Sequence, residues 1–114
     1  MALIKIDTRR ITDWGTFHEA FAAALGFPDF YGRNMNAWID CMSYVDEPGA
    51  GMSSVDVKPG EILVLQLEGV NEFATRCREQ YDAVVECVAF VNWRRIEQGQ
   101  KAVLALSYYK QPES

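Results

Sequence analysis

The sequence is poor in the residues that most catalytic and metal sites use. It holds a single histidine, His18, and three cysteines, Cys41, Cys77 and Cys87, with no Cys-x-x-Cys pair. One histidine excludes a histidine-rich metal centre. An odd number of scattered cysteines is typical of reduced, buried thiols rather than of a disulfide framework or a zinc site. We therefore expect no cofactor and no metal.

Long apolar runs and the common catalytic motifs are also missing. No stretch approaches the length of a membrane-spanning helix, and the first residues, MALIKIDTRR, lack the apolar core and cleavage site of a signal peptide. The absence of GxGxxG, GxxxxGK[ST], GxSxG and HExxH motifs leaves the usual nucleotide-binding, hydrolase and zinc-protease interpretations without support. We expect a cytoplasmic protein that is not an enzyme.

The chain also has fewer basic than acidic residues. The chain has eleven basic and sixteen acidic residues, a formal net charge of −5, and such a chain repels nucleic acid and anionic membranes. Residues 28–61 hold six acidic residues and only two basic ones. This concentration favours docking of a basic protein, although an ordinary solvated helix face and loop would have the same composition.

What the chain does contain is enough apolar material for one domain, because 49% of its 114 residues are hydrophobic. Periodicity and caps predict strands at 2–6, 62–69 and 102–109, and helices from Asp13 to Gly26, after Asn34, at 71–79 and at 82–98. This order predicts an α/β fold with a small three-stranded parallel sheet packed with about four helices. We expect a single domain over 1–110 and a frayed tail at 111–114.

The segment 46–60 is dense in glycine, proline, serine and aspartate and has no regular period, so it predicts an inserted surface loop. Because loop length affects stability only logarithmically, deleting much of 48–57 is expected to cost little.

The helix after Asn34 places one lone carboxylate on its outer face. Its helical period predicts a core-facing stripe of Met35, Trp38, Ile39 and Met42. The polar side chains at Asn36, Asp40 and Ser43 then gather on another side. We expect the Asp40 carboxylate to point to solvent.

Other candidates for chemistry have simpler structural interpretations. His18 falls near the edge of an apolar stripe and is read as a packing histidine, while the Asp40 charge beside Cys41 weakens the case for a nucleophilic thiol. Trp93 is predicted to pack, and Arg94 with Arg95 to form a solvated helix end. An enzyme would be supported only by a catalytic activity of the isolated protein that disappears in His18→Ala or Cys41→Ser.

The segment PDFYGRNMNAWIDC, residues 28–41, resembles the signature of the barstar family, intracellular inhibitors of barnase-type bacterial ribonucleases. The matching residues are Pro28, Tyr31, Gly32, Asn34, Ala37, Asp40 and Cys41. The order of predicted elements extends the resemblance over residues 2–109. It implies a barstar-like three-stranded parallel sheet packed with helices, and an immunity-type inhibitor that blocks a cytotoxic ribonuclease without catalysis.

The resemblance also implies a site. The helix after the Tyr-Gly turn would plug the ribonuclease active site, and Asp40 would occupy the pocket of an RNA phosphate. The expected partner-binding residues are Phe30, Tyr31, Arg33, Asn34, Asn36, Ile39, Asp40, Ser43, Tyr44, Asp46 and Glu47. The partner would be a basic ribonuclease or ribonuclease toxin domain, bound by an inhibitor that is a monomer when free and contacts neither nucleic acid nor membrane.

Several positions depart from the family pattern. Asn36 stands where the family has a second interface aspartate, Phe30 replaces a tyrosine and Ile39 an exposed tryptophan. Arg94 and Gln98 fall where the family carries glutamates, and the loop at 46–60 is longer than its counterpart. Changes at interface positions favour a changed target. A second hypothesis therefore stays open, a non-catalytic interaction or regulatory module with a non-nuclease partner.

Overall fold

A parallel sheet organises the fold. The computed structural model describes residues 2–111. Its strands are β1 (Ala2–Asp7), β2 (Leu63–Glu68) and β3 (Leu104–Ser107), in the order β1-β2-β3. All neighbouring strands are parallel, with Leu63 opposite both Ala2 and Leu104. The predicted α/β class with a three-stranded parallel sheet is confirmed.

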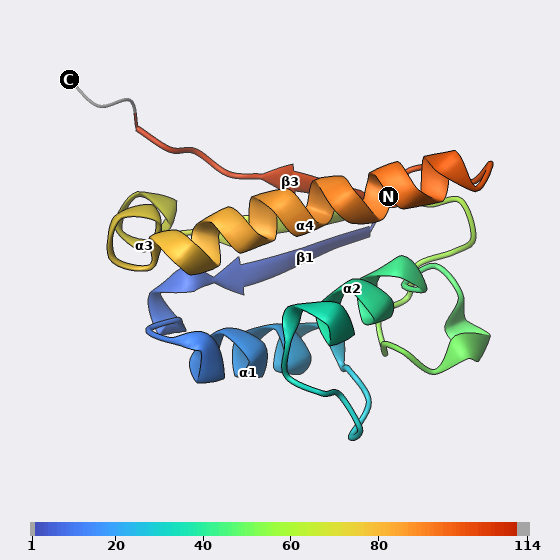
Figure 1. Ribbon diagram of the computed structural model, residues 1–114, viewed down its shortest axis with the longest axis horizontal. Helices are drawn as coiled ribbons and strands as arrows, with labels where there is room; N and C mark the ends of the chain where they lie inside the picture. The colour runs from blue at the N-terminus through green and yellow to red at the C-terminus, as the bar shows by residue number, and fades with distance from the viewer. Residues whose placement is uncertain (1, 112–114) are drawn as a thin grey trace.

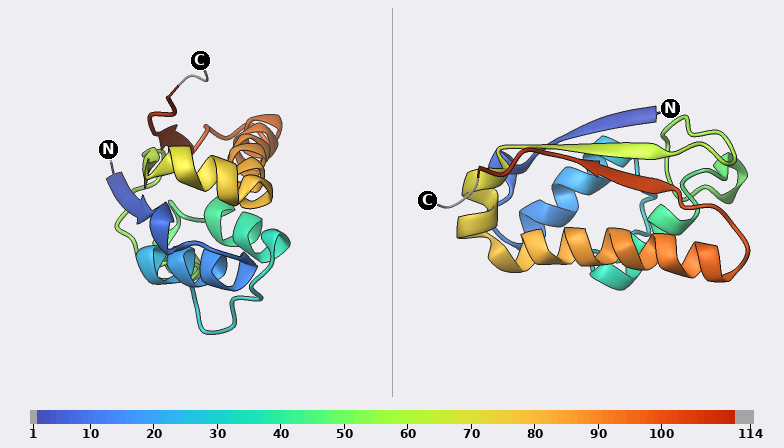
Figure 2. Two further views of the ribbon diagram at one scale, coloured as in Figure 1. Left: turned by 90° about the vertical axis from the view of Figure 1, so that its left-hand side faces the viewer. Right: turned by 90° about the horizontal axis from the view of Figure 1, so that it is seen from above.

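Four α-helices accompany the sheet within the described residues: α1 (Trp14–Leu25), α2 (Met35–Ser43), α3 (Val70–Arg76) and α4 (Arg78–Glu97). α1, α2 and α4 lie on one side of the sheet, while α3 lies at the carboxyl ends of the strands (Figures 1 and 2). The core fills the space between the two layers. Its fully buried side chains include Phe17, Phe21, Trp38, Leu63 and Leu65.

Local caps explain where α1 and α2 begin. The Asp13 carboxylate accepts from the Thr16 N–H at 2.8 Å and the Thr16 hydroxyl accepts from the Asp13 N–H at 3.0 Å, a reciprocal capping box. The Asn34 side chain accepts from the Ala37 N–H at 2.8 Å. Both caps lie at the positions predicted from the sequence.

The second half of the chain differs in detail from the prediction. The helices are separated at Cys77 rather than near residue 80, because the buried Cys77 leaves helical geometry with φ −128° and ψ 52°. β3 is shorter than predicted, beginning at Leu104. Just before it, the Asn92 side-chain oxygen accepts from the N–H groups of Val103 and Leu104, both at 3.0 Å. One α4 side chain thus fixes where β3 begins.

The loop between α2 and β2 is packed onto the fold. Val57 is completely buried, and Met52 and Val55 pack against the core. Ser54 donates its backbone N–H to Leu25 at 2.9 Å. At the end of α1, Gly26 has φ 63°, and a Cβ there would lie 2.5 Å from the Ser54 Cβ. These contacts argue against the expectation that deleting much of this loop costs little stability.

Deleting residues 48–57 is accordingly expected to lower the free energy of unfolding by at least ~2 kcal/mol, because it empties the Val57 site. Urea denaturation followed by circular dichroism would measure the loss. Removing only 49–51 is the matched control, since all three residues are exposed and a Cβ added at Gly49 or Gly51 would meet no atom within 4 Å outside the adjacent residues. Equal stability of the two deletions would contradict a structural role for Val57.

The end of the chain is described as far as Gln111. Its backbone N–H donates to the Asn71 side-chain oxygen at 2.7 Å, so this first residue of the expected frayed tail is attached to α3. Residues 112–114 lie outside the described residues. Among the helices of the described part, none combines the length and the apolar character needed to span a bilayer. Residues 2–111 also contain no cluster of His, Cys, Asp and Glu side chains suited to hold a metal ion.

Candidate functional site

The α2 helix has one buried and one open face. Trp38 and Met42 are fully buried, and Met35 and Ile39 are partly buried against the core. The Trp38 ring meets Phe21 of α1 edge-on, with ring centroids 5.7 Å apart. This packing fixes the rotation of α2 and leaves Asp40 exposed. Within residues 2–111 the Asp40 carboxylate makes no hydrogen bond or ion pair.

The turn before α2 is held from inside by a buried polar pair. His18 of α1 is 3% exposed, and its Nδ1 shares a 2.5 Å hydrogen bond with the Tyr31 hydroxyl. Burial raises the pKa of Tyr31, so its hydroxyl stays protonated. In the turn itself, Arg33 has a positive φ of 52°.

Acid should loosen this pair. Burial, together with the charge of Arg33, lowers the pKa of His18 in the folded protein. In the unfolded chain the pKa of His18 stays at about 6.5, so the unfolded chain binds a proton at this residue first as the pH falls. The free energy of unfolding should fall as the pH drops below about 6.5, and stop falling on this account below the folded pKa.

The measurement is urea denaturation between pH 7 and 5.5 for the wild type and for His18→Gln, which removes the titrating group but keeps polar atoms near Tyr31. The change in the free energy of unfolding with pH should be smaller in the variant, because the His18 contribution is removed. An identical pH dependence in both proteins would show that His18 does not contribute to it.

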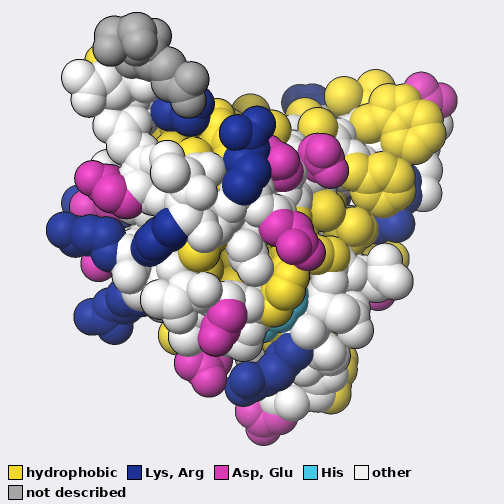
Figure 3. Space-filling view, turned by 60° about the vertical axis from the view of Figure 1, so that its left-hand side comes forward, with side chains coloured by type: hydrophobic (Ala, Val, Ile, Leu, Met, Phe, Trp, Pro, Cys, Tyr) yellow, Lys and Arg dark blue, Asp and Glu magenta, His cyan; other side chains and the backbone are white. Residues whose placement is uncertain are grey.

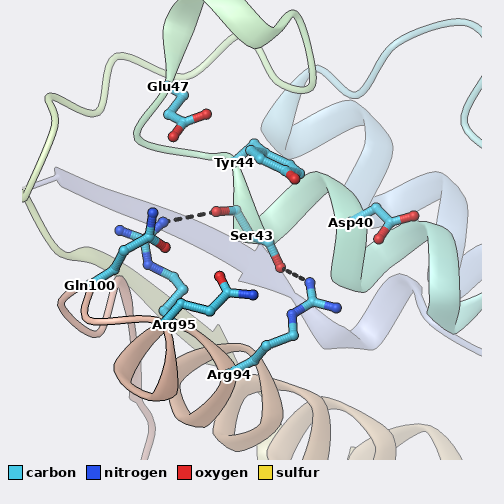
Figure 4. A pocket seen from close by; sticks show the side chains of 8 residues that line it. Asp40, Ser43, Tyr44, Glu47, Arg94, Arg95 and Gln100 are labelled. Atoms are coloured by element: carbon cyan, nitrogen blue, oxygen red, sulfur yellow. Dashed lines mark hydrogen bonds between the residues drawn. The ribbon is translucent and has the colours of Figure 1, made fainter.

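A depression lies between α2 and the carboxyl end of α4. Its volume is about 270 Å³, and it is lined by Asp40, Ser43, Tyr44, Glu47, Arg94, Arg95, Gln98 and Gln100. Figure 4 shows Asp40 and Tyr44 on the α2 side and the two arginines reaching across from α4. Arg94 Nη2 donates to the Ser43 hydroxyl at 2.6 Å. The walls of the depression therefore carry opposite charges.

Arg95 is the centre of a buried network beneath this depression. It is 6% exposed and Asp46 is 4% exposed, and their side chains form a bidentate ion pair at 3.0 and 3.2 Å. Arg95 also donates to the carbonyl of Ser43 at 2.9 Å and to that of Lys101 at 2.8 Å. The network ties together the end of α2, the loop and the end of α4. The prediction that Arg95 is solvated is therefore wrong.

The family comparison decides the relationship of the chain. Residues 1–106 match the family model described as Barstar (barnase inhibitor). The chain belongs to the barstar family. Among curated proteins, no sequence shows significant similarity to the chain. Barstar membership agrees with the sheet, with the helices on one side of it and with the signature at 28–41.

The predicted partner-binding residues of this barstar-family chain divide into three groups. The exposed ones are Phe30, Arg33, Asn34, Asn36, Asp40, Tyr44 and Glu47. Ile39 is partly buried. Tyr31, Ser43 and Asp46 are buried, at 9%, 8% and 4% exposure. The side chains of Ser43 and Asp46 are both hydrogen-bonded to arginines of α4.

Side chains of α4 were missing from the predicted site. Arg94 and Gln98 line the depression, and Trp93, expected to pack, is 58% exposed. The stripe Val84, Val88, Val91 and Arg95 points inward, and Ile96 is therefore 57% exposed. Including Arg95 in the helical period of the apolar residues would have predicted the correct buried face of α4. A charged residue, however, is rarely assigned to a buried position.

The barstar-like site offers little for catalysis by its cysteine or histidine. Cys41 is 2% exposed, and burial with the neighbouring Asp40 charge raises its pKa to about 11. A thiol with this pKa is almost entirely protonated at neutral pH and is a poor nucleophile. His18 is buried against Tyr31. The Asp40 carboxylate next to Cys41, by contrast, is exposed.

Proposed function

We propose that this barstar-family protein is an immunity-type inhibitor that blocks the active site of a cytotoxic ribonuclease with the exposed face of α2. The observation that carries the proposal is Asp40, an exposed carboxylate without an internal partner, on a helix whose other face is locked into the core by Trp38. An exposed carboxylate of this kind costs little folding free energy in the free protein, and it is already positioned for binding.

The chemistry of Asp40 suits a site that binds RNA phosphate. A ribonuclease holds the phosphate with arginine, lysine or histidine donors, and a carboxylate can accept the same charge-assisted hydrogen bonds. Docking excludes water and strengthens these bonds, since the effective dielectric falls. Asp40 would therefore act as a phosphate mimic rather than as a catalyst.

The surroundings of Asp40 provide both contact area and steering. Phe30, 75% exposed, and Tyr44, 47% exposed, flank α2 and present rings suited to an interface. Glu47 lines the depression with Asp40, and the chain carries a net charge of −5. Association with a basic enzyme should therefore be fast at low salt and slower as ionic strength rises.

Titration of the purified protein into a fluorogenic RNA-cleavage assay tests the proposal. The enzymes are a panel of barnase-like microbial ribonucleases, each at a known active-site concentration. Stoichiometric loss of activity in at least one of them is expected. If a folded sample inhibits no member, the ribonuclease proposal fails, and the alternative of a regulatory module with a non-nuclease partner is favoured.

The alternative has an observation in its favour. The depression beside Asp40 carries the cation Arg94, and α2 presents the neutral Asn36. A surface of mixed charge suits a partner that is not uniformly basic. Recovery of a non-nuclease protein that competes for the Asp40 face would support this alternative.

A further inference from the structure

An aromatic and cationic patch lies on the open side of α4. Phe90 and Trp93 are 42% and 58% exposed, and their ring centroids are 6.1 Å apart. The Arg94 guanidinium carbon lies 5.5 Å from the centroid of the Phe90 ring. Figure 3 shows hydrophobic side chains gathered over α4, at the upper right of the view. We call Phe90, Trp93 and Arg94 the α4 patch.

The α4 patch is continuous with the depression beside Asp40. Arg94 belongs to both, because its Nη2 donates to the Ser43 hydroxyl of α2 at 2.6 Å and its side chain lines the depression. Ser43 lies three positions after Asp40 on α2, a spacing that puts the two side chains about 5–6 Å apart at Cβ. A partner that covers Asp40 therefore also meets Arg94.

The α4 patch is not part of the buried stripe of α4. The inward stripe of α4 is Val84, Val88, Val91 and Arg95, so Trp93 and Phe90 contribute mainly to the surface. Arg94 is already ordered by Ser43 and by Phe90, while its Nε and Nη1 atoms make no hydrogen bond within residues 2–111. A cation held in place with free donors, beside an exposed tryptophan, has the composition of an interface anchor.

We propose that the docking surface extends from α2 onto the α4 patch, and that the partner is a ribonuclease with a carboxylate and an apolar rim beside its cationic phosphate site. This proposal rests on the ribonuclease partner proposed above. Charge complementarity carries it: Asp40 and Glu47 require cations, whereas Arg94, on the opposite wall of the same depression, requires an anion. A uniformly basic partner surface would leave Arg94 facing like charge.

The test measures dissociation constants by calorimetry for the same panel of barnase-like ribonucleases, including members with an acidic and members with a basic residue beside the phosphate site. The variants are Trp93→Ala, Arg94→Glu and Asp40→Ala. Tyr109→Ala is the matched aromatic control, because Tyr109 is 75% exposed and follows β3. Arg78→Glu is the charge control, since it lies on the same helix about 24 Å from Arg94. Thermal unfolding establishes that each variant is folded.

Trp93→Ala and Arg94→Glu should each weaken binding to acid-flanked members by about 10-fold or more, and the controls by less than about twofold. Arg94→Glu should also shift the preference toward base-flanked members. If both α4 variants bind like wild type while Asp40→Ala does not, the α4 proposal is overturned and the proposed function stands. If the α4 variants weaken binding and Asp40→Ala does not, the role of the α4 patch in docking is supported and Asp40 is removed from the proposed function. No binding by any panel member would overturn both.

Discussion

Replacing Asp40 with alanine is expected to weaken ribonuclease binding by at least ~2 kcal/mol, about 30-fold in the dissociation constant. The loss exceeds that of an ordinary surface contact because the variant leaves the cations of the phosphate site buried without a partner. The fold should be unaffected, since Asp40 is exposed and makes no internal hydrogen bond in the described residues. Inhibition constants and thermal unfolding, measured on the same samples, separate the two effects.

Two further variants make this prediction specific. Asp40→Asn keeps the size of the side chain and removes its charge, so it should lose nearly as much affinity as alanine if the carboxylate mimics a phosphate. Glu72→Ala removes one negative charge from an exposed position of α3 and should change the dissociation constant by less than about twofold. Wild-type affinity in a folded Asp40→Ala variant would exclude Asp40 as the centre of the interface.

Replacing Arg95 with methionine is expected to lower the free energy of unfolding by about 3–5 kcal/mol, the range for breaking a buried ion pair. Asp46, 4% exposed, would lose both of its contacts with the guanidinium. The carbonyls of Ser43 and Lys101 would lose a donor as well. Chemical denaturation with circular dichroism would measure this loss, which is a large part of the stability of a small domain.

A double-mutant cycle identifies the cause. Arg95→Met combined with Asp46→Leu leaves no isolated charge in the interior, so the double variant should be less destabilised than the two single losses added together. Arg94→Met is the neighbouring control, and it should cost less than about 1 kcal/mol because Arg94 lies at the surface of the depression. A small loss in Arg95→Met, or additive losses in the cycle, would contradict a coupled buried pair.

Local signals in the sequence predicted much of the architecture. The Asp13 and Asn34 caps and the apolar run of β2 act over a few residues, so each could be recognised from its neighbours alone. The helical period around Trp38 correctly predicted a buried face and therefore an exposed Asp40. Boundaries governed by tertiary contacts were less accurate, as at β3, where an α4 side chain, Asn92, holds the residues at which the strand begins.

The sequence by itself determined the strand and helix order, the family signature and the position of Asp40 on the open face of α2, because these depend on short-range periodicity and capping. Only the tertiary structure decided which charges remain available. Asp46 was counted as a surface acid, yet it pairs with Arg95, 49 residues away along the chain. Arg94 was assigned to a solvated helix end, yet it shares a depression with Asp40. Whether a charge is buried or exposed depends on which distant segments pack against it, and a pattern of neighbouring residues does not contain that information.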